Sequence, residues 1–184
     1  MARIAILGPP GAGKTWLARR LGRLLDVPVH DLDDLYWLAG WQRPAADEWE
    51  RLQTTLTESP SWIIAGNYQP TAHLRIRRAD LVLVVNPGTL ICLWRMVTRT
   101  IRIYRGDNAT LPQRLRASGR WTAHRGLWRI ALIAVRYKRT AWLRTQETAH
   151  RYGVPVVEVG PRVELSELAR SIQDLPRLAP ETPS

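Results

Sequence analysis

Short apolar runs separated by longer amphipathic stretches recur along the whole chain. Apolar runs of strand length lie at residues 4–7, 27–30, 62–65, 81–85 and 155–159, and Gly, Pro, Asn or Asp follows most of them. Stretches of helical spacing lie at residues 15–25, 44–58, about 89–104, most of 121–151, and 163–175. Because strands apolar on both faces alternate with helices, the pattern predicts a three-layer α/β fold with five parallel strands and helices on both faces.

The pattern also predicts how the chain is organised. A chain of 184 residues suits one domain with a sizeable core, which we place at residues 1–175. Residues 105–120 are rich in arginine and lack a steady period, which predicts a mobile lid inserted into that domain. The Pro-rich residues 176–184 are predicted to form a flexible tail.

A glycine-rich segment follows the first predicted strand and opens the first predicted helix. Residues 8–15 read Gly-Pro-Pro-Gly-Ala-Gly-Lys-Thr and match the phosphate-loop pattern G-x-x-x-x-G-K-[ST] in full. In such a loop backbone N–H groups point at phosphate oxygens, Lys14 contacts the β- and γ-phosphates, and the Thr15 hydroxyl is a ligand for Mg²⁺. The alternative, a chance glycine turn, is disfavoured because Lys14 is one of only two lysines in the chain. The residues predicted to contact the nucleotide are Gly8, Gly11, Ala12, Gly13, Lys14, Thr15 and Trp16.

Carboxylates follow the second predicted strand, at the edge of the sheet where ligands of open parallel sheets bind. Asp31 and Asp33 share one side of an extended segment, so they are candidates beside the phosphate loop. We expect Asp31 to hold Mg²⁺ together with Thr15, and Asp33 to orient or deprotonate an attacking hydroxyl. The alternative is that Asp33 or Asp34 only caps the helix that follows.

The net charge of +11 is concentrated in one part of the chain. Residues 94–151 contain 14 Lys and Arg against 2 acids, whereas the rest contains 13 against 14. Arg99 and Arg102 share a helix face with Arg95, and Arg105 continues the line toward the predicted lid. We take Arg99, Arg102 and Arg105 as candidates that neutralise charge on a transferring phosphoryl group, a solvated basic face being the alternative.

The remaining composition bears on partners and location. Residues 125–144 interleave arginine with aromatic side chains, which makes nucleic acid a further candidate partner, although a buried helical stripe explains the same apolar positions better. The longest apolar run of this half, residues 130–135, is far below the roughly 20 residues of a membrane span, so we expect no membrane partner. The lone cysteine, Cys92, excludes an internal disulfide and favours a cytoplasmic location.

The chain resembles the DNA topology modulation proteins, a group of small phosphate-loop relatives of adenylate kinase, over roughly residues 1–159. The resemblance rests on residues 8–15, on His-Asp-Leu-Asp-Asp-Leu-Tyr-Trp at 30–37, on Trp-Ile-Ile-Ala-Gly-Asn-Tyr at 62–68, on Arg75 with Ala79 and Asp80, and on Pro87, Cys92 and Arg95. It implies a phosphate-loop NTPase fold of the nucleotide-kinase kind with an Arg-rich lid, ATP and Mg²⁺ as cofactors, and phosphoryl transfer to a small acceptor.

The chain departs from that group at three positions. Members of the group usually carry aspartate before Gly-Asn-Tyr and before the proline after the fourth strand, where this chain has Ala65 and Asn86. They tend to place histidine where this chain has Asp31, which restores a D-x-D pattern like that of shikimate-type kinases. Our hypothesis is that Asp31 and Asp33 have taken over the Mg²⁺ role.

These features favour an ATP-dependent phosphotransferase that acts on a small acceptor. The loss of acids at Ala65 and Asn86 keeps open a nucleotide-binding regulatory or accessory protein with little turnover, and the basic segment keeps open an ATPase that binds nucleic acid. The sequence names neither the acceptor nor the oligomeric state.

Overall fold

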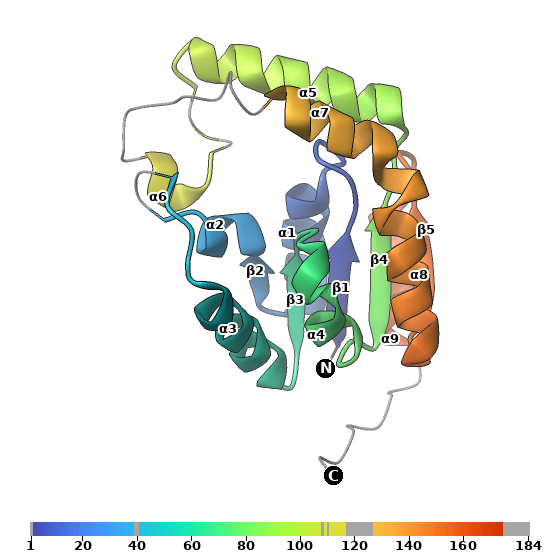
Figure 1. Cartoon of the computed structure of the whole chain (residues 1–184). Coiled ribbons are helices and arrows are strands. Elements are labelled where there is room, and N and C mark those ends of the chain that lie inside the picture. Colours follow the sequence, from blue (N-terminus) through green and yellow to red (C-terminus); the bar gives the residue numbers. More distant parts are fainter. Residues whose placement is uncertain (1, 39–40, 108, 110, 117–126, 175–184) are drawn as a thin grey trace.

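The central feature of the fold is a five-stranded parallel sheet (Figure 1). The computed structural model describes residues 2–38, 41–107, 109, 111–116 and 127–174. The strands are β1 (Arg3–Leu7), β2 (Val29–Asp31), β3 (Trp62–Ala65), β4 (Leu81–Val85) and β5 (Val156–Val159). Their order is β2-β3-β1-β4-β5, so that β1 lies in the middle and pairs with both β3 and β4.

Helices cover both faces of this sheet. On one face α1 (Lys14–Leu25) and α9 (Leu165–Gln173) pack against side chains of β1, β3 and β4. On the other face α3 (Ala46–Glu58), α4 (Ala72–Ile76) and α8 (Ala141–Arg151) pack against the alternate side chains of the same strands. The five residues of β4 are Leu and Val and all are buried, because both of their faces meet helices.

Two further helices lie across the end of the sheet toward which β1 and β4 run. They are α5 (Thr89–Tyr104) and α7 (Leu127–Arg136), and Figure 1 shows them lying side by side above the strands. The shorter elements are α2 (Leu32–Tyr36), α6 (Gln113–Arg116) and the 3-10 turns η2 (Gln69–Thr71) and η4 (Tyr137–Arg139). Among the described residues, none of the helices has the length and apolar character needed to span a membrane.

The predicted α/β fold, with five parallel strands and helices on both faces, is confirmed. The second strand lies at Val29–Asp31, later than the predicted 27–30, because Asp31 pairs with Ala65 in the sheet. The hydrophobic pattern does not predict α2, α4 and α6, since helices of four or five residues show no period.

The predicted lid is described only in part. Within 105–120 the structure describes residues 105–107, 109 and 111–116, and Leu111 and Leu115 are buried there. Residues 108, 110 and 117–120 lie outside the described residues, as does the predicted tail at 176–184. The lid and the extent of the single domain therefore stay predictions.

One glycine of α1 provides a test of this packing. A Cβ at Gly22 would lie 2.3 Å from Cγ2 of Val29 and 3.0 Å from the Val27 carbonyl oxygen, so α1 approaches β2 closely at this position. We expect Gly22→Ala to lower the free energy of unfolding by about 1–2 kcal/mol, because overpacking outweighs the gain in helix propensity. Urea denaturation followed by circular dichroism would measure the change.

The matched control is Gly160→Ala, because a Cβ at Gly160 meets no atom within 4 Å. That variant should change the free energy of unfolding by less than about 0.5 kcal/mol. Equal midpoints for the two variants would contradict the close contact between α1 and β2.

Candidate phosphate-binding site

The glycine-rich loop connects β1 to α1 and is held between β4 and α5. A Cβ at Gly8 would lie 2.5 Å from the Val85 carbonyl oxygen, and one at Gly11 would lie 2.5 Å from the Cys92 carbonyl oxygen. Both glycines have positive φ, 150° and 77°. Since a side chain at either position would collide with backbone, the close approach of β4 and α5 requires glycine here.

An arginine of α5 ties that helix to the loop. Nη1 of Arg95 donates a hydrogen bond of 2.8 Å to the Ala12 carbonyl oxygen. The sequence analysis placed Arg95 on the basic helix face but did not select it as a site residue. Its i, i+4 relation to Arg99 was the available signal. Arg95 therefore fixes the position of α5, and with it Arg99, relative to the loop.

Lys14 folds back over the loop. Its Nζ donates hydrogen bonds of 3.1 Å to the carbonyl oxygens of Gly8 and Pro9. Burial lowers the pKa of Lys14, while the charges of Asp33 and Asp31 raise it and that of Arg99 lowers it. Phosphate oxygens would be stronger partners for this ammonium group than the two neutral carbonyl groups.

Thr15 and Asp31 meet across the gap between α1 and β2. The Thr15 hydroxyl donates a hydrogen bond of 2.7 Å to Oδ2 of Asp31. Oδ1 of Asp31 accepts a hydrogen bond of 3.1 Å from the backbone N–H of Asp33 and so caps α2. The capping role considered for Asp33 or Asp34 belongs to Asp31. Burial is the main cause that raises the pKa of the Asp31 carboxyl, and the charge of Asp33 adds to it.

Asp33 is held by a tyrosine from the next strand connection. The Tyr68 hydroxyl donates a hydrogen bond of 2.8 Å to Oδ1 of Asp33. Burial raises the pKa of Tyr68, and the Asp33 charge raises it further, so the hydroxyl keeps its proton. The ring of Tyr68 packs against both Tyr36 and Trp49, at centroid distances of 4.6 and 5.1 Å. Sequence reasoning missed this role for Tyr68, which depends on a contact 35 residues away.

A buried arginine supports the loop that carries Tyr68. Arg75 is fully buried, and its guanidinium donates to the Gly66 carbonyl oxygen at 3.2 Å and to Oε1 of Gln53. Gln53 in turn donates a hydrogen bond of 2.8 Å to the Thr71 hydroxyl. Burial lowers the pKa of Arg75 to about 10. This network connects α3 and α4 to the end of β3, and so fixes the position of Tyr68.

The other predicted residues lie at different distances from the loop. Arg99 acts electrostatically on Lys14 and lies on the side of α5 that carries Cys92 and Met96. Arg102 and Arg105 are exposed near the C-terminal end of α5, and neither has a hydrogen bond to the described residues of the loop. Trp16 is exposed on α1, where the Arg20 guanidinium lies 5.8 Å from its ring centroid. Its predicted contact with the nucleotide stays a prediction.

The basic segment has contacts of its own. Arg116 donates hydrogen bonds to the carbonyl oxygens of Leu111 at 2.9 Å and Ala109 at 2.7 Å, so it stabilises the turn around α6. The side chain of Arg114 and the whole of residue 120 lie outside the described part of the chain.

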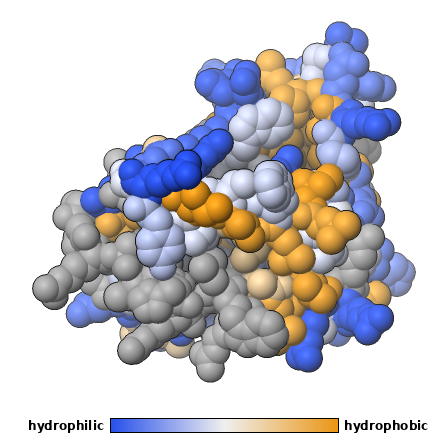
Figure 2. Space-filling view, turned by 90° about the horizontal axis from the view of Figure 1, so that it is seen from above, coloured by the Kyte–Doolittle hydropathy of each residue, from blue (hydrophilic) through white to orange (hydrophobic). Residues whose placement is uncertain are grey.

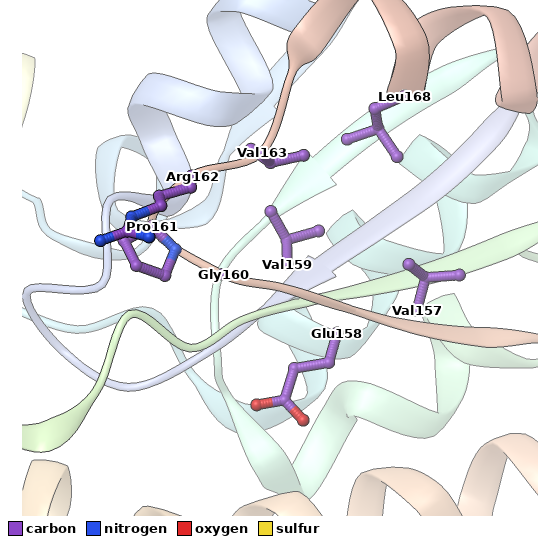
Figure 3. A pocket seen from close by; sticks show the side chains of 8 residues that line it. All are labelled: Val157, Glu158, Val159, Gly160, Pro161, Arg162, Val163 and Leu168. Carbon is purple, nitrogen blue, oxygen red and sulfur yellow. The ribbon is translucent and has the colours of Figure 1, made fainter.

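An open pocket lies at the edge of the sheet beyond β4. Its lining residues are Val157, Glu158, Val159, Gly160, Pro161, Arg162, Val163 and Leu168. Figure 3 shows Val163 and Leu168 on one side of β5, with Glu158 pointing to the other. Asn86 connects this edge to β4, because its side chain donates a hydrogen bond of 2.6 Å to Glu158 and its backbone N–H donates to the Val159 carbonyl oxygen at 2.9 Å.

The oxygen atoms of Thr15 and Asp31 fit a magnesium ion better than a transition metal. Both are hard oxygen donors, and they lie 2.7 Å apart. In the described part of the chain, no three His, Cys, Asp or Glu side chains group together as a complete set of metal ligands. Mg²⁺ does not need such a set, since it takes its other ligands from phosphates and water.

The raised pKa of Asp31 has a consequence for stability. A carboxyl whose pKa is raised on folding is less stable in its ionised form in the folded state, so ionised Asp31 costs stability at neutral pH. We expect Asp31→Asn to raise the free energy of unfolding of the ligand-free protein at pH 7. The gain should disappear as the pH falls below the ordinary carboxyl pKa. Thermal unfolding across that pH range would measure it.

The control is Asp47→Asn, which removes an exposed carboxylate paired with Arg51 at 2.8 Å. Because exposed ion pairs contribute about 0–1 kcal/mol, this variant should be neutral or slightly destabilising. A loss of stability in Asp31→Asn at pH 7 would contradict the electrostatic role given to Asp31.

Comparison with known proteins supports the fold. Neither a family model nor a curated protein matches the sequence. Among solved structures, the chain is similar to shikimate kinase from Acinetobacter baumannii in complex with shikimate, at 20% identity and a TM-score of 0.54 over 95% of this chain and 92% of that one. It is also similar to a candidate kinase from Chloroflexus aurantiacus, at 15% identity and a TM-score of 0.56 over 96% and 98%. The chain therefore has the fold of the phosphate-loop kinases.

Proposed function

We propose that this protein is an ATP-dependent phosphotransferase that transfers the γ-phosphoryl group to a hydroxyl of a small acceptor. One observation carries the proposal. The Thr15 hydroxyl, at the end of the phosphate loop, donates a hydrogen bond to Asp31, the first carboxylate of the D-x-D pattern. Such a transfer requires at least a loop that binds phosphate, here with Lys14, and a neighbouring carboxylate that can accept a proton.

The nucleotide would be bound mainly through its phosphates. Backbone N–H groups of residues 11–16 and the N-terminus of α1 would bind the β- and γ-phosphates. Lys14 would leave the Gly8 and Pro9 carbonyl oxygens to contact the same phosphates. Thr15 and Asp31 would hold Mg²⁺, which supplies positive charge that stabilises the transferring phosphoryl group.

The base would lie toward the loop that follows β5. The end of β4 contacts Gly8 of the phosphate loop through Val85, and β5 pairs with β4 on its other side. Residues 160–162 are therefore the next exposed backbone beyond the loop, in the pocket of Figure 3. Contacts of this kind through backbone would suit adenine, and the sequence contains no guanine-specific N-K-x-D-like motif.

Asp33 would act on the acceptor. Its carboxylate would accept the proton of the acceptor hydroxyl while the hydroxyl oxygen attacks the γ-phosphorus and the bond to the leaving diphosphate breaks. The hydrogen bond from Tyr68 would orient the carboxylate. Arg99, supported by Arg102 and Arg105 at the lid, would neutralise the charge that develops on the phosphoryl oxygens.

The position of Ala65 explains how the Mg²⁺ site could have moved. Ala65 is the last residue of β3 and is buried, and it pairs in the sheet with Asp31 at the end of β2. A carboxylate missing from β3 is thus present at the same level on the neighbouring strand. This supports the proposal that the chain belongs to the group that the sequence resembles, the DNA topology modulation proteins, and that Asp31 compensates for the acid absent at Ala65.

A second function, a nucleotide-dependent accessory protein with little turnover, has one observation in its favour. Asn86, which takes the place of an acid, is engaged with Glu158 at 2.6 Å on the β5 side. ATP binding without transfer or hydrolysis would establish this alternative. A nucleic-acid ATPase would instead show DNA affinity that falls steeply with salt. Either role would suit the cytoplasm, the location that the lone cysteine favours.

We expect Asp33→Asn to lower kcat by about 10²–10⁴-fold while leaving the Kd for ATP nearly unchanged, because it removes the proton acceptor alone. Lys14→Ala should weaken both ATP binding and transfer. The assay is transfer of label from γ-labelled ATP with Mg²⁺ to nucleoside monophosphates, small hydroxyl metabolites and DNA.

The matched control is Asp34→Asn, since Asp34 is the adjacent carboxylate and lies 3.8 Å from Arg19 on α1. Its kcat should fall less than about 3-fold. Equal rates for the Asp33 and Asp34 variants would remove Asp33 from the mechanism. Transfer that survives in Lys14→Ala would show that the phosphate loop is not the site.

A further inference from the structure

The outer face of α5 carries a stripe of exposed apolar side chains. We call it the α5 stripe, and its members are Leu90, Trp94, Val97, Ile101 and Tyr104, with exposed fractions of 82%, 69%, 53%, 45% and 61%. They are spaced by four, three, four and three residues, which is the spacing of a seam between two helices. A helix that only covered its own domain would place such a stripe inward.

The inward face of α5 is already occupied. Cys92, Met96 and Ile103 are buried on that side, where they cover the phosphate loop and the sheet end. The α5 stripe is therefore a second apolar face of the same helix. Figure 2, the view onto the end of the molecule formed by α5 and α7, shows hydrophobic side chains gathered there between hydrophilic ones.

The exposed area is large for an isolated monomer. With about 200 Å² for each large side chain, the five exposed fractions correspond to on the order of 600 Å². Soluble monomers rarely expose a larger contiguous patch than this. Specific interfaces bury about 800 Å² on each partner, so the stripe and its immediate flanks are close to what a stable dimer needs.

Charged residues flank the α5 stripe at one end only. The positions that flank its middle, Leu93, Thr98 and Thr100, are uncharged, whereas Arg102 and Arg105 are exposed at its C-terminal end. Two other arginines of α5 are directed toward the phosphate loop, since Arg95 bonds to Ala12 and Arg99 acts on Lys14. An anionic membrane favours cations along the whole rim of an apolar face, whereas the cations that flank this stripe lie at one end of α5.

We propose that the α5 stripe is the interface of a homodimer in which α5 of one copy packs antiparallel to α5 of the other. A two-fold axis at Val97 pairs Val97 with its own copy, Trp94 with Ile101, and Leu90 with Tyr104. Such an interface is self-complementary, as two-fold symmetry requires. The antiparallel direction also aligns the helix dipoles favourably and keeps Arg102 and Arg105 of the two copies at opposite ends.

The dimer is tested by the mass of the chain in solution. Sedimentation of the full chain at micromolar concentration should give twice the monomer mass, and Trp94→Glu and Val97→Glu should each give the monomer. The matched control is Leu24→Glu on α1, where Leu24 is 51% exposed, and this variant should stay dimeric. Far-ultraviolet circular dichroism verifies that each variant is folded.

A monomeric wild-type chain would overturn the proposal, as would a dimer that persists in both folded α5 variants. A monomer that binds vesicles containing anionic lipid would also overturn it, in favour of a membrane surface.

The direction of the helices is tested by cross-linking. Oxidation should join two copies of Val97→Cys into a disulfide-linked dimer, because Val97 meets its own copy at the axis. Leu90→Cys should not cross-link, since the two Leu90 positions lie at opposite ends of an antiparallel pair. The native Cys92 is buried, so the wild-type chain gives the background level of cross-linking. Efficient cross-linking of Leu90→Cys, or none of Val97→Cys, would overturn the antiparallel arrangement even where the Glu variants fail to fold.

Discussion

The hydrogen bond between the Thr15 hydroxyl and the Asp31 carboxylate, 2.7 Å long, joins the start of α1 to the end of β2. Each neighbouring part of the site depends on that junction. Asp31 caps α2 with its second oxygen, α2 carries Asp33, and Asp33 accepts the hydrogen bond of Tyr68. Displacement of Asp31 would therefore move both carboxylates, Asp31 and Asp33, together.

The parallel sheet makes this junction possible. Because β1, β2 and β3 all run in one direction, the phosphate loop, Asp31 and Gly66 leave the sheet at the same edge. The register that pairs Asp31 with Ala65 brings the Asp31 carboxylate to the level of the position where the group that the sequence resembles usually carries aspartate. Under the proposed function, a metal ligand would have been exchanged between neighbouring strands through a change of two residues, with the backbone unchanged. Arg75, buried beneath the β3 connection, holds that backbone in place.

Local signals in the sequence were sufficient for the sheet, the phosphate loop and the two aspartates. The strands are apolar runs with clear boundaries, and the loop motif has a fixed spacing, so both can be predicted from short windows. The contacts of Tyr68, Arg75 and Arg95 could not, because each joins segments that only the fold brings together. Capping was considered as an alternative for Asp33 or Asp34 and not for Asp31, since a helix as short as α2 gives no period from which to locate its first residue. The exposure of the α5 stripe could not be predicted either, because the sequence does not reveal which of the two apolar faces of α5 meets the core.

The most direct measurement is the effect of Mg²⁺ on ATP affinity, determined by titration calorimetry with and without the ion in the wild-type protein and in Asp31→Asn. If Thr15 and Asp31 hold the metal beside the phosphate loop, Mg²⁺ should tighten ATP binding in the wild type. In the variant that gain should be largely lost, while affinity for ATP without Mg²⁺ is unchanged. The same Mg²⁺-dependent gain in both proteins would contradict the assignment of Asp31 as the carboxylate of the site.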